Sequence, residues 1–231
     1  MRSLNTSFQF WIDTMKWYRV ISVLLIALTG ITAKAQEYSD PYTGYLEEVF
    51  MDMDYEPNLA TPVVPKSDKQ AVRNYVKKVA SDMMRHYIID LMRSDEVFVV
   101  SIPTDDLFLP NDTLLSPYAQ KRLDPLLKFM SSQDPNMYKI VYSVHTDDTG
   151  STQYQEDLSH ARSNSVYDWL MDQIDNGVIS EDQIIIPYAF GSDDPLQPND
   201  TMKHRAENRR LDVVFIPGPK MIEMAHQGVL K

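Results

Sequence analysis

One arginine lies on a helix face that should be buried. The residues that recur every four positions after Thr152 share one flank of a helix, and they are Leu158, Arg162, Val166 and Leu170. Because the others are apolar, this flank is expected to pack on the rest of the domain. A guanidinium on such a face needs an acceptor, since a buried unpaired charge is costly.

Acidic residues lie close by in the sequence, where the preceding strand is expected to end, at His145-Thr146-Asp147-Asp148. A strand end followed by Gly150 and a helix is a common place for a binding site in α/β folds. Two interpretations are open. Asp147 and Arg162 form an internal salt bridge, which spacing alone favours, or they face a zwitterion, with Asp147 binding an ammonium and Arg162 a carboxylate.

The surrounding segments alternate between strand and helix patterns. Strand patterns cover residues 97–102, 138–144, 183–189 and 209–216. One helix should begin at Ser116-Pro117 and be kinked by Pro125. The other should begin in a capping box over residues 152–155 and stop at Asn176-Gly177. This order predicts an α/β sandwich with helices packed on a sheet.

The residues outside this domain divide into four segments, at 1–35, 36–66, 67–95 and 218–231, around a domain at 96–217. Residues 36–66 are rich in proline, tyrosine and acidic residues, which predicts a tether. Residues 67–95 carry apolar side chains at helical spacing up to Tyr87, which predicts an amphipathic helix to roughly Met84 that could reach Arg93. Residues 36–93 either contact an envelope protein partner or lie across the domain. The tail at 218–231 has no assignment.

The N-terminus has the pattern of a secretory signal peptide. Lys16 and Arg19 precede an apolar run over residues 20–31, and Ala33-Lys34-Ala35 is a typical cleavage site. The run of 12 residues is short for a bilayer span, so no transmembrane segment is expected after cleavage, although an uncleaved anchor is the alternative. Met15 is an alternative start.

Charge and cysteine content exclude several functions. Cleavage after Ala35 would remove four basic and one acidic residue from the 22 and 33 of the chain, which leaves a net charge of −14. Such a surface repels nucleic acid, so no nucleic-acid partner is expected. The chain has no cysteine, which excludes disulfides, thiolate metal sites, a thiol nucleophile and a lipid anchor on cysteine.

Four pieces of the chain, in order, resemble the OmpA C-terminal domain family. Residues 145–151 and 158–166 resemble its T-D-x-x-G and L-S-x-x-R-A-x-x-V motifs, residues 102–108 its first strand and loop, and residues 205–211 its closing A-x-N-R-R-V strand. The resemblance covers roughly residues 97–216. It implies an OmpA-like βαβαββ two-layer sandwich, with helices packed on a mixed four-stranded sheet.

The resemblance also implies a ligand. In the family, the residues that match Asp147 and Arg162 hold the diaminopimelate of the peptidoglycan peptide stem, and their separation of 15 residues fits. Thr146 and the loop to Gly150 would shape the pocket through backbone donors, and Arg209 would support it. Gln155 replaces the family asparagine and Ser163 the family alanine, so Gln155 either contributes to binding with altered affinity or only caps the helix.

The implied protein is a non-enzymatic binding module without a cofactor. It would reside in the periplasm of a diderm bacterium, bound to peptidoglycan and associated with the outer membrane through a partner. The alternative is a structural component of a trans-envelope machine, such as a secretion system or motor stator. No metal site is expected at His145, and no catalytic set accompanies Ser159. Asp105-Asp106 and Asp193-Asp194 are expected to cap or turn the chain.

Overall fold

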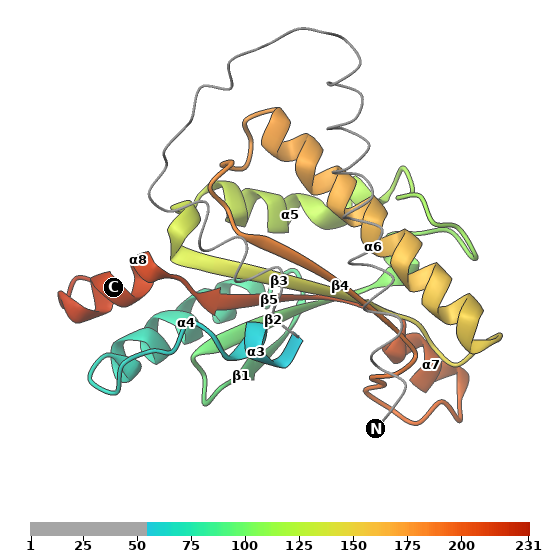
Figure 1. Cartoon of the computed structure of the whole chain (residues 1–231), viewed down its shortest axis with the longest axis horizontal. Helices are drawn as coiled ribbons and strands as arrows, with labels where there is room; N and C mark the ends of the chain where they lie inside the picture. The colour runs from blue at the N-terminus through green and yellow to red at the C-terminus, as the bar shows by residue number, and fades with distance from the viewer. Residues whose placement is uncertain (1–54) are drawn as a thin grey trace, which may run out of the picture. The chain divides into compact units, whose positions relative to one another are not determined.

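A five-stranded mixed sheet organises the part of the chain that the computed structural model describes, residues 55–231 (Figure 1). In spatial order the strands are β1 (Ile88–Met92), β2 (Val97–Pro103), β5 (Arg210–Pro217), β3 (Tyr138–His145) and β4 (Ile185–Gly191). β3 and β4 are parallel, and all other neighbours are antiparallel. The four expected strands are present within two residues of their predicted bounds, and the α/β sandwich is confirmed. The predicted strand number was wrong, because β1 adds a fifth strand at one edge.

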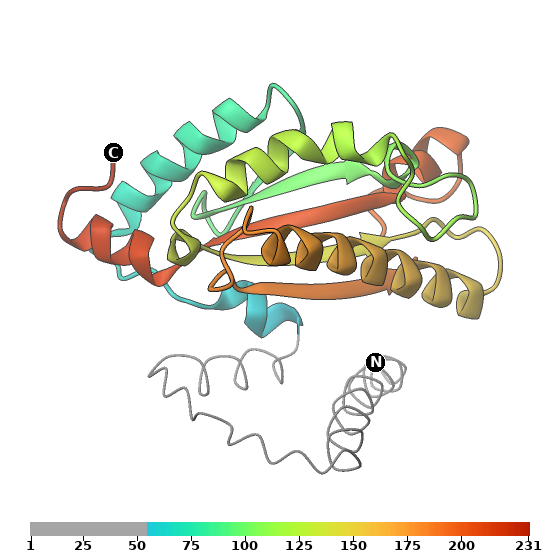
Figure 2. The same cartoon turned by 90° about the horizontal axis from the view of Figure 1, so that it is seen from above.

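The helices pack mainly on one face of the sheet. α5 (Ala119–Ser131) and α6 (Thr152–Asp175) lie side by side over it, and α4 (Lys69–Met83) packs into the same core beside them (Figure 2). Alternate strand residues point into this core. Ile140, Tyr142 and Val144 do so on β3, as their spacing predicts. Phe98 and Phe215 stack at its centre with ring centroids 4.6 Å apart.

The opposite face of the sheet is also apolar. Its buried residues are Val97, Val99, Val141, Ile186, Val214 and Ile216. The short helix α3 (Tyr55–Ala60) packs Tyr55 and Leu59 against this face. The prediction that residues 36–66 form a tether without packed elements is therefore wrong for α3. This part of the segment lies on the domain. Residues 1–54, with the predicted signal peptide and most of the tether, lie outside the described residues.

The predicted helix to roughly Met84 is present as α4, but its possible extension to Arg93 is wrong. α4 ends at Met83, and residues 88–92 instead form β1, which pairs with β2 from Ile88↔Ser101 to Met92↔Val97. Tyr87 continues the helical spacing of apolar residues in the sequence, and its side chain is buried. It lies beyond the end of α4, however, so its burial does not come from a helix face. Glu96 lies in the turn between β1 and β2. Its Oε1 pairs with Nζ of Lys69 at 2.8 Å and with Nη2 of Arg73 at 3.1 Å, which connects the hairpin to α4.

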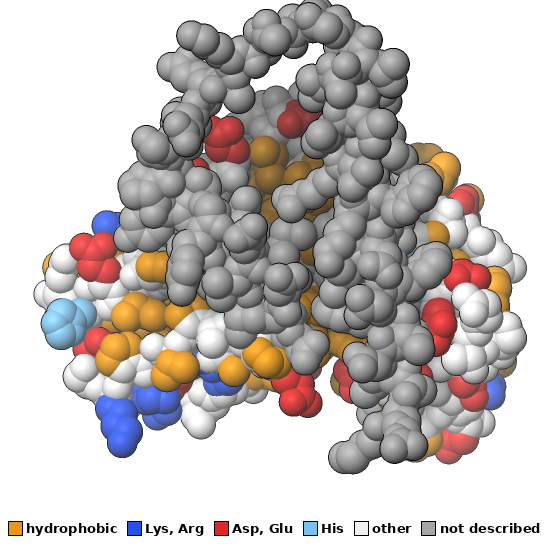
Figure 3. All heavy atoms as spheres, viewed as in Figure 1, with side chains coloured by type: hydrophobic (Ala, Val, Ile, Leu, Met, Phe, Trp, Pro, Cys, Tyr) orange, Lys and Arg blue, Asp and Glu red, His pale blue; other side chains and the backbone are white. Residues whose placement is uncertain are grey.

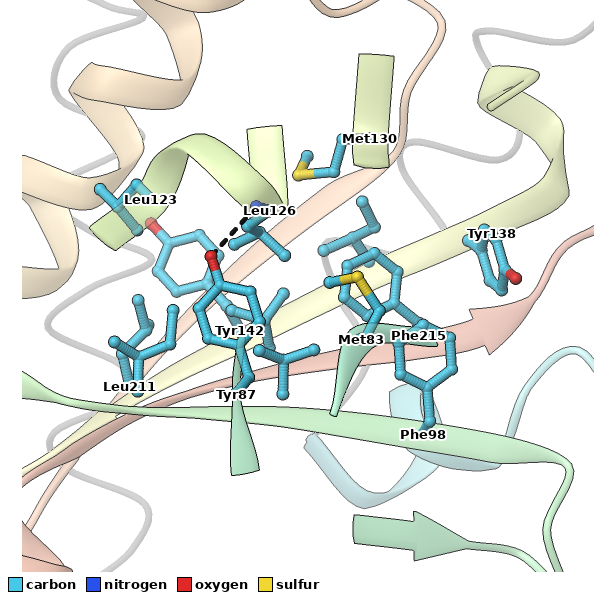
Figure 4. Packing of buried hydrophobic residues seen from close by; sticks show 14 of the residues in the cluster. Met83, Tyr87, Phe98, Leu123, Leu126, Met130, Tyr138, Tyr142, Leu211 and Phe215 are labelled. Carbon is cyan, nitrogen blue, oxygen red and sulfur yellow. Dashed lines mark hydrogen bonds between the residues drawn. The ribbon is translucent and has the colours of Figure 1, made fainter. Parts of the chain in front are cut away.

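Tyr87 compensates for Pro125, which lies inside α5. Proline disturbs the hydrogen bonds of the preceding helical turn. The Tyr87 hydroxyl enters this turn: it donates to the carbonyl of Arg122 at 2.7 Å. It also accepts from the amide of Leu126 at 3.0 Å (Figure 4). These two groups would otherwise bond to each other in the helix. One side chain thus connects the hairpin region to the helix that covers the sheet.

One smaller expectation is corrected, and two segments without a predicted element contain helices. The cap of α6 is Ser151, whose hydroxyl accepts from the Tyr154 amide at 3.2 Å, so the predicted capping box began one residue late. The C-terminal tail contains α8 (Pro219–His226), which buries Met221. The long polar loop before β5 contains α7 (Met202–Asn208). None of the helices within residues 55–231 is long and apolar enough to cross a membrane.

Candidate functional site

The loop after β3 holds Asp147 at the end of the sheet where α6 begins (Figure 1). The Thr146 amide donates to the carbonyl of Gly191 at 2.7 Å, which ties the loop to the end of β4. Gly150 adopts φ +89°, and a Cβ there would lie 2.7 Å from Cδ1 of Tyr154. Glycine is therefore required both by the backbone conformation and by the close approach of the helix.

Asp147 is buried and held by two donors. Its Oδ1 accepts from the Thr149 amide at 2.9 Å, and its Oδ2 from Nη1 of Arg209 at 2.6 Å. Burial raises the pKa of the Asp147 carboxyl, but the hydrogen bonds from Thr149 and Arg209 outweigh burial and hold the pKa below its usual value. Asp147 is therefore an anion at neutral pH.

Arg209 joins Asp147 to a second carboxylate. Its Nε and Nη2 donate to the two oxygens of Asp105 at 2.9 and 2.6 Å, which is the bidentate arrangement that suits a guanidinium. The hydrogen bond to Asp105, opposed by burial and assisted by the bond to Asp147, raises the pKa of Arg209 above its ordinary value. Arg209 thus contacts Asp147, and its role in supporting a ligand pocket stays a prediction.

Arg162 is buried on α6, as its spacing predicts, but its partners are neutral. Its Nε donates to the carbonyl of Asp112 at 2.9 Å, and Nη2 lies 3.5 Å from the carbonyl of Leu109. Its guanidinium carbon lies 4.8 Å from the centre of the Phe108 ring, a cation–π contact. Burial lowers the pKa of Arg162 from its ordinary value, although nearby acidic groups oppose this change.

The internal salt bridge between Arg162 and Asp147 is therefore not formed. Within residues 55–231, Asp147 pairs with Arg209, and no carboxylate oxygen lies within 4.0 Å of the Arg162 guanidinium. The physical reason is that the loop before α5 presents backbone carbonyls to Arg162, and these satisfy part of its hydrogen-bonding capacity without neutralising its charge.

Gln155 and Thr146 both make hydrogen bonds that hold the loop, and their contribution to ligand binding stays a prediction. The amide nitrogen of Gln155 lies 3.2 Å from the carbonyl of Gly150, and its oxygen accepts from the Ser192 hydroxyl at 2.6 Å. Gln155 therefore positions the loop and completes no capping box. The Thr146 amide is bonded to Gly191, so it is not a free donor, and its buried hydroxyl has no partner among the described residues.

Two further residues belong to this cluster and were not predicted. Asp105 was assigned to a turn, yet it accepts two hydrogen bonds from Arg209. Arg205 of α7 pairs with Asp148 at 2.9 Å, beside Asp147. The four-residue spacing of Arg205 and Arg209 was a usable signal: Arg205 lies in α7, and Arg209 is the C-cap residue that follows its last helical residue. On the visible face in Figure 3, acidic side chains gather over α7 and its surroundings.

His145 and Ser159 have structural surroundings. His145 is 1% exposed, stacks on Phe190 and lies 2.9 Å from the Ser143 hydroxyl. Burial, and then the neighbouring Arg210, lower its pKa well below the ordinary value, so the ring is neutral. The Ser159 hydroxyl accepts from the Gly191 amide at 3.0 Å. Residues 55–231 contain no group of three or more potential metal ligands.

Fold and site together define an α/β sandwich with a charged site in the loops beyond β2 and β3. Residues 107–209 match the family model described as "OmpA family". The chain thus carries an OmpA-like domain, and the resemblance of the motifs is confirmed.

The relatives differ from this chain in length. Outer membrane protein A of Klebsiella aerogenes is 34% identical over 108 residues, which are 46% of this chain and 29% of that protein. Outer membrane protein A of Serratia marcescens is 28% identical over 129 residues, 56% of this chain and 34% of that protein. The match spans about a third of the length of these curated relatives.

A solved structure shows the same fold. The crystal structure of a MotB-like protein from Desulfovibrio vulgaris aligns with a TM-score of 0.54 and 20% identity, and the alignment covers 65% of this chain and 95% of that one. At this identity, the likeness concerns the fold alone.

Proposed function

We propose that this domain binds the peptide stem of peptidoglycan non-covalently and thereby attaches a partner or an envelope structure to the cell wall. The observation that carries the proposal is that the Asp147 carboxylate has a charged partner within the domain, whereas the Arg162 guanidinium has none among the described residues. Asp147 is a fixed anion, and Arg162 is a buried cation whose described partners are neutral carbonyls and a ring. The free end of diaminopimelate carries an ammonium and a carboxylate, which complement this pair.

Each charge keeps capacity for such a ligand. The oxygens of a carboxylate accept about four hydrogen bonds together, and Asp147 receives two from described residues. The second terminal nitrogen of Arg162, Nη1, donates to no described residue, so the guanidinium can bond to a ligand carboxylate. Burial of both groups strengthens their attraction to a ligand by excluding water.

The rest of the site positions these two groups. Arg209 and the Thr149 amide orient Asp147, and Gln155 holds the loop through Gly150. The membership of residues 107–209 in an OmpA-like domain supports the ligand, and the signal-like residues 1–35 support a periplasmic location. No cofactor, metal or reaction is part of the proposal.

Co-sedimentation of the purified protein with isolated sacculi that contain diaminopimelate tests the proposal. We expect wild type to sediment, and we expect Asp147→Asn and Arg162→Lys each to lose at least roughly tenfold in affinity, because truncating one partner of a buried charge pair costs roughly 2–5 kcal/mol. The matched control is Asp168→Asn, an exposed acid on α6 that should bind like wild type. Circular dichroism confirms that each variant is folded. Equal sedimentation of all four proteins would exclude this site.

A further inference from the structure

We infer that a groove next to this site binds a second carboxylate of the same peptide stem, that of the glutamate preceding diaminopimelate. The inference rests on the proposed function and extends it to residues before the family match. The groove has a volume of about 580 Å³, and its walls come from the turn after α4, the loop after β2 and the first turn of α5. This volume lies within the range of small-ligand sites.

The groove shares a wall with the Asp147–Arg162 site. Asp105, Phe108 and Leu109 line the groove. The same three residues contact the guanidinium groups of the site: Asp105 bonds to Arg209, and Phe108 and Leu109 contact Arg162. A peptide whose diaminopimelate lies between Asp147 and Arg162 therefore has its neighbouring residue next to this groove.

The charges in the groove favour an anion. Its two acids are already occupied, since Asp105 is bound by Arg209 and Asp106 lies 3.2 Å from Nε of Arg122. Lys121 makes no hydrogen bond or ion pair through its side chain with any residue in the part of the chain that the structure describes. Arg85 has only an exposed contact with Asp82 at 3.4 Å. On a chain with a net charge of −11, Lys121, which has no described partner, and Arg85, whose one pair is exposed, form a positive patch.

The walls of the groove are held in place. Nη1 of Arg122 donates to the carbonyl of His86 at 2.7 Å, and its guanidinium carbon lies 5.1 Å from the centre of the Tyr87 ring. These contacts join the turn after α4 to α5. Lys121 and Arg85 therefore project from fixed backbone, which reduces the ordering cost of binding a ligand.

Calorimetric titration with two stem peptides tests this subsite. The peptides are identical except that the α-carboxyl of glutamate is free in one and amidated in the other. We expect wild type to bind the free acid more tightly. We expect Lys121→Gln to weaken binding of the free acid roughly threefold, and Arg85→Gln/Lys121→Gln roughly tenfold, because each exposed charge pair contributes modestly and the two contributions add. Neither variant should change the affinity for the amide.

The control variant is Lys78→Gln/Lys128→Gln. It also removes two positive charges, from exposed lysines on α4 and α5 that lie outside the groove. It should retain the preference of wild type for the free acid. If the groove variants bind both peptides like wild type while Asp147→Asn binds neither, the subsite is wrong and the proposed function stands. If wild type binds neither peptide, both are wrong.

Discussion

The two ends of β2 both carry clusters of charged residues, but the clusters differ in how far they are neutralised. At the start of the strand, Glu96 is 1% exposed and lies within 3.8 Å of three cations, Lys69, Arg73 and Arg93. At its other end, the chain of ion pairs runs from Asp105 through Arg209 to Asp147 and does not reach Arg162. The first cluster is closed, and the second leaves a buried cation without a described anion.

Under the proposed function, this difference separates a structural cluster from a binding cluster. The three cations around Glu96 come from α4 and the hairpin, so their pairing fastens the segment before the family match to the sheet. A carboxylate surrounded in this way has little capacity for a ligand. Arg162 is held by carbonyls, which fix its position and leave its charge for an external carboxylate.

The largest expected effect is on stability, at the closed cluster. Glu96→Gln keeps the shape of the side chain but leaves three cations without their anion. Breaking a buried pair usually costs several kcal/mol, and because these cations are partly exposed we expect a loss of about 2 kcal/mol in the free energy of unfolding. For a domain of this size, this lowers the melting temperature by roughly 4–8 °C.

Thermal unfolding measures this loss, with the exposed Glu181→Gln as the control that should melt like wild type. Sedimentation with sacculi should be the same for wild type and both variants at a temperature where all are folded. Loss of wall binding by folded Glu96→Gln would show that the two ends of β2 are not separate in function.

The sequence predicted the position of Arg162 but not its partners. Four-residue spacing on an apolar face is a property of one helix, so it is visible in the chain. The carbonyls of Leu109 and Asp112 lie about 50 positions away and belong to the backbone, which every residue type has. Nothing in the side chains could mark them, and the interpretation that pairs Arg162 directly with Asp147, the acid after the preceding strand, was therefore incorrect.

The edge strand β1 was missed for a related reason. Helical spacing of apolar residues continued to Tyr87, whose burial depends on the turn of α5 around Pro125. That contact joins segments more than 30 residues apart, so local periodicity could not distinguish it from a helix face. The central strands were predicted closely because their alternating residues are buried by the sheet itself, as on Ile140, Tyr142 and Val144.

A smaller effect, on ligand binding, is expected from Arg209, which joins Asp105 to Asp147 at the other end of β2. Lysine at position 209 cannot donate to both oxygens of Asp105 and also reach Asp147, so Asp147 should lose its orientation. We expect Arg209→Lys to bind the stem peptide roughly tenfold more weakly, with stability changed by less than about 1 kcal/mol, because Arg209 and Asp105 are both partly exposed.

Titration calorimetry measures this change against Arg205→Lys, in which the exposed pair with Asp148 is altered four residues earlier, on α7. The control should stay within about twofold of wild type. If both variants lose affinity equally, the effect belongs to the general charge of α7 and not to the orientation of Asp147.

The smallest effect is a pH dependence of stability that Asp147 should produce and that Asp147→Asn should lack. The folded pKa of this carboxyl is lowered, because the hydrogen bonds from Thr149 and Arg209 outweigh burial. A lowered folded pKa means that the ionised group stabilises the fold above the unfolded pKa, near pH 4, and that this contribution is lost as pH falls through the folded pKa. The difference in unfolding free energy between wild type and Asp147→Asn should therefore be constant from pH 7 to about 5 and shrink below about pH 4. Urea unfolding at several pH values measures it, and a difference that stays constant down to pH 2.5 would contradict the assignment of Asp147 as a hydrogen-bonded anion.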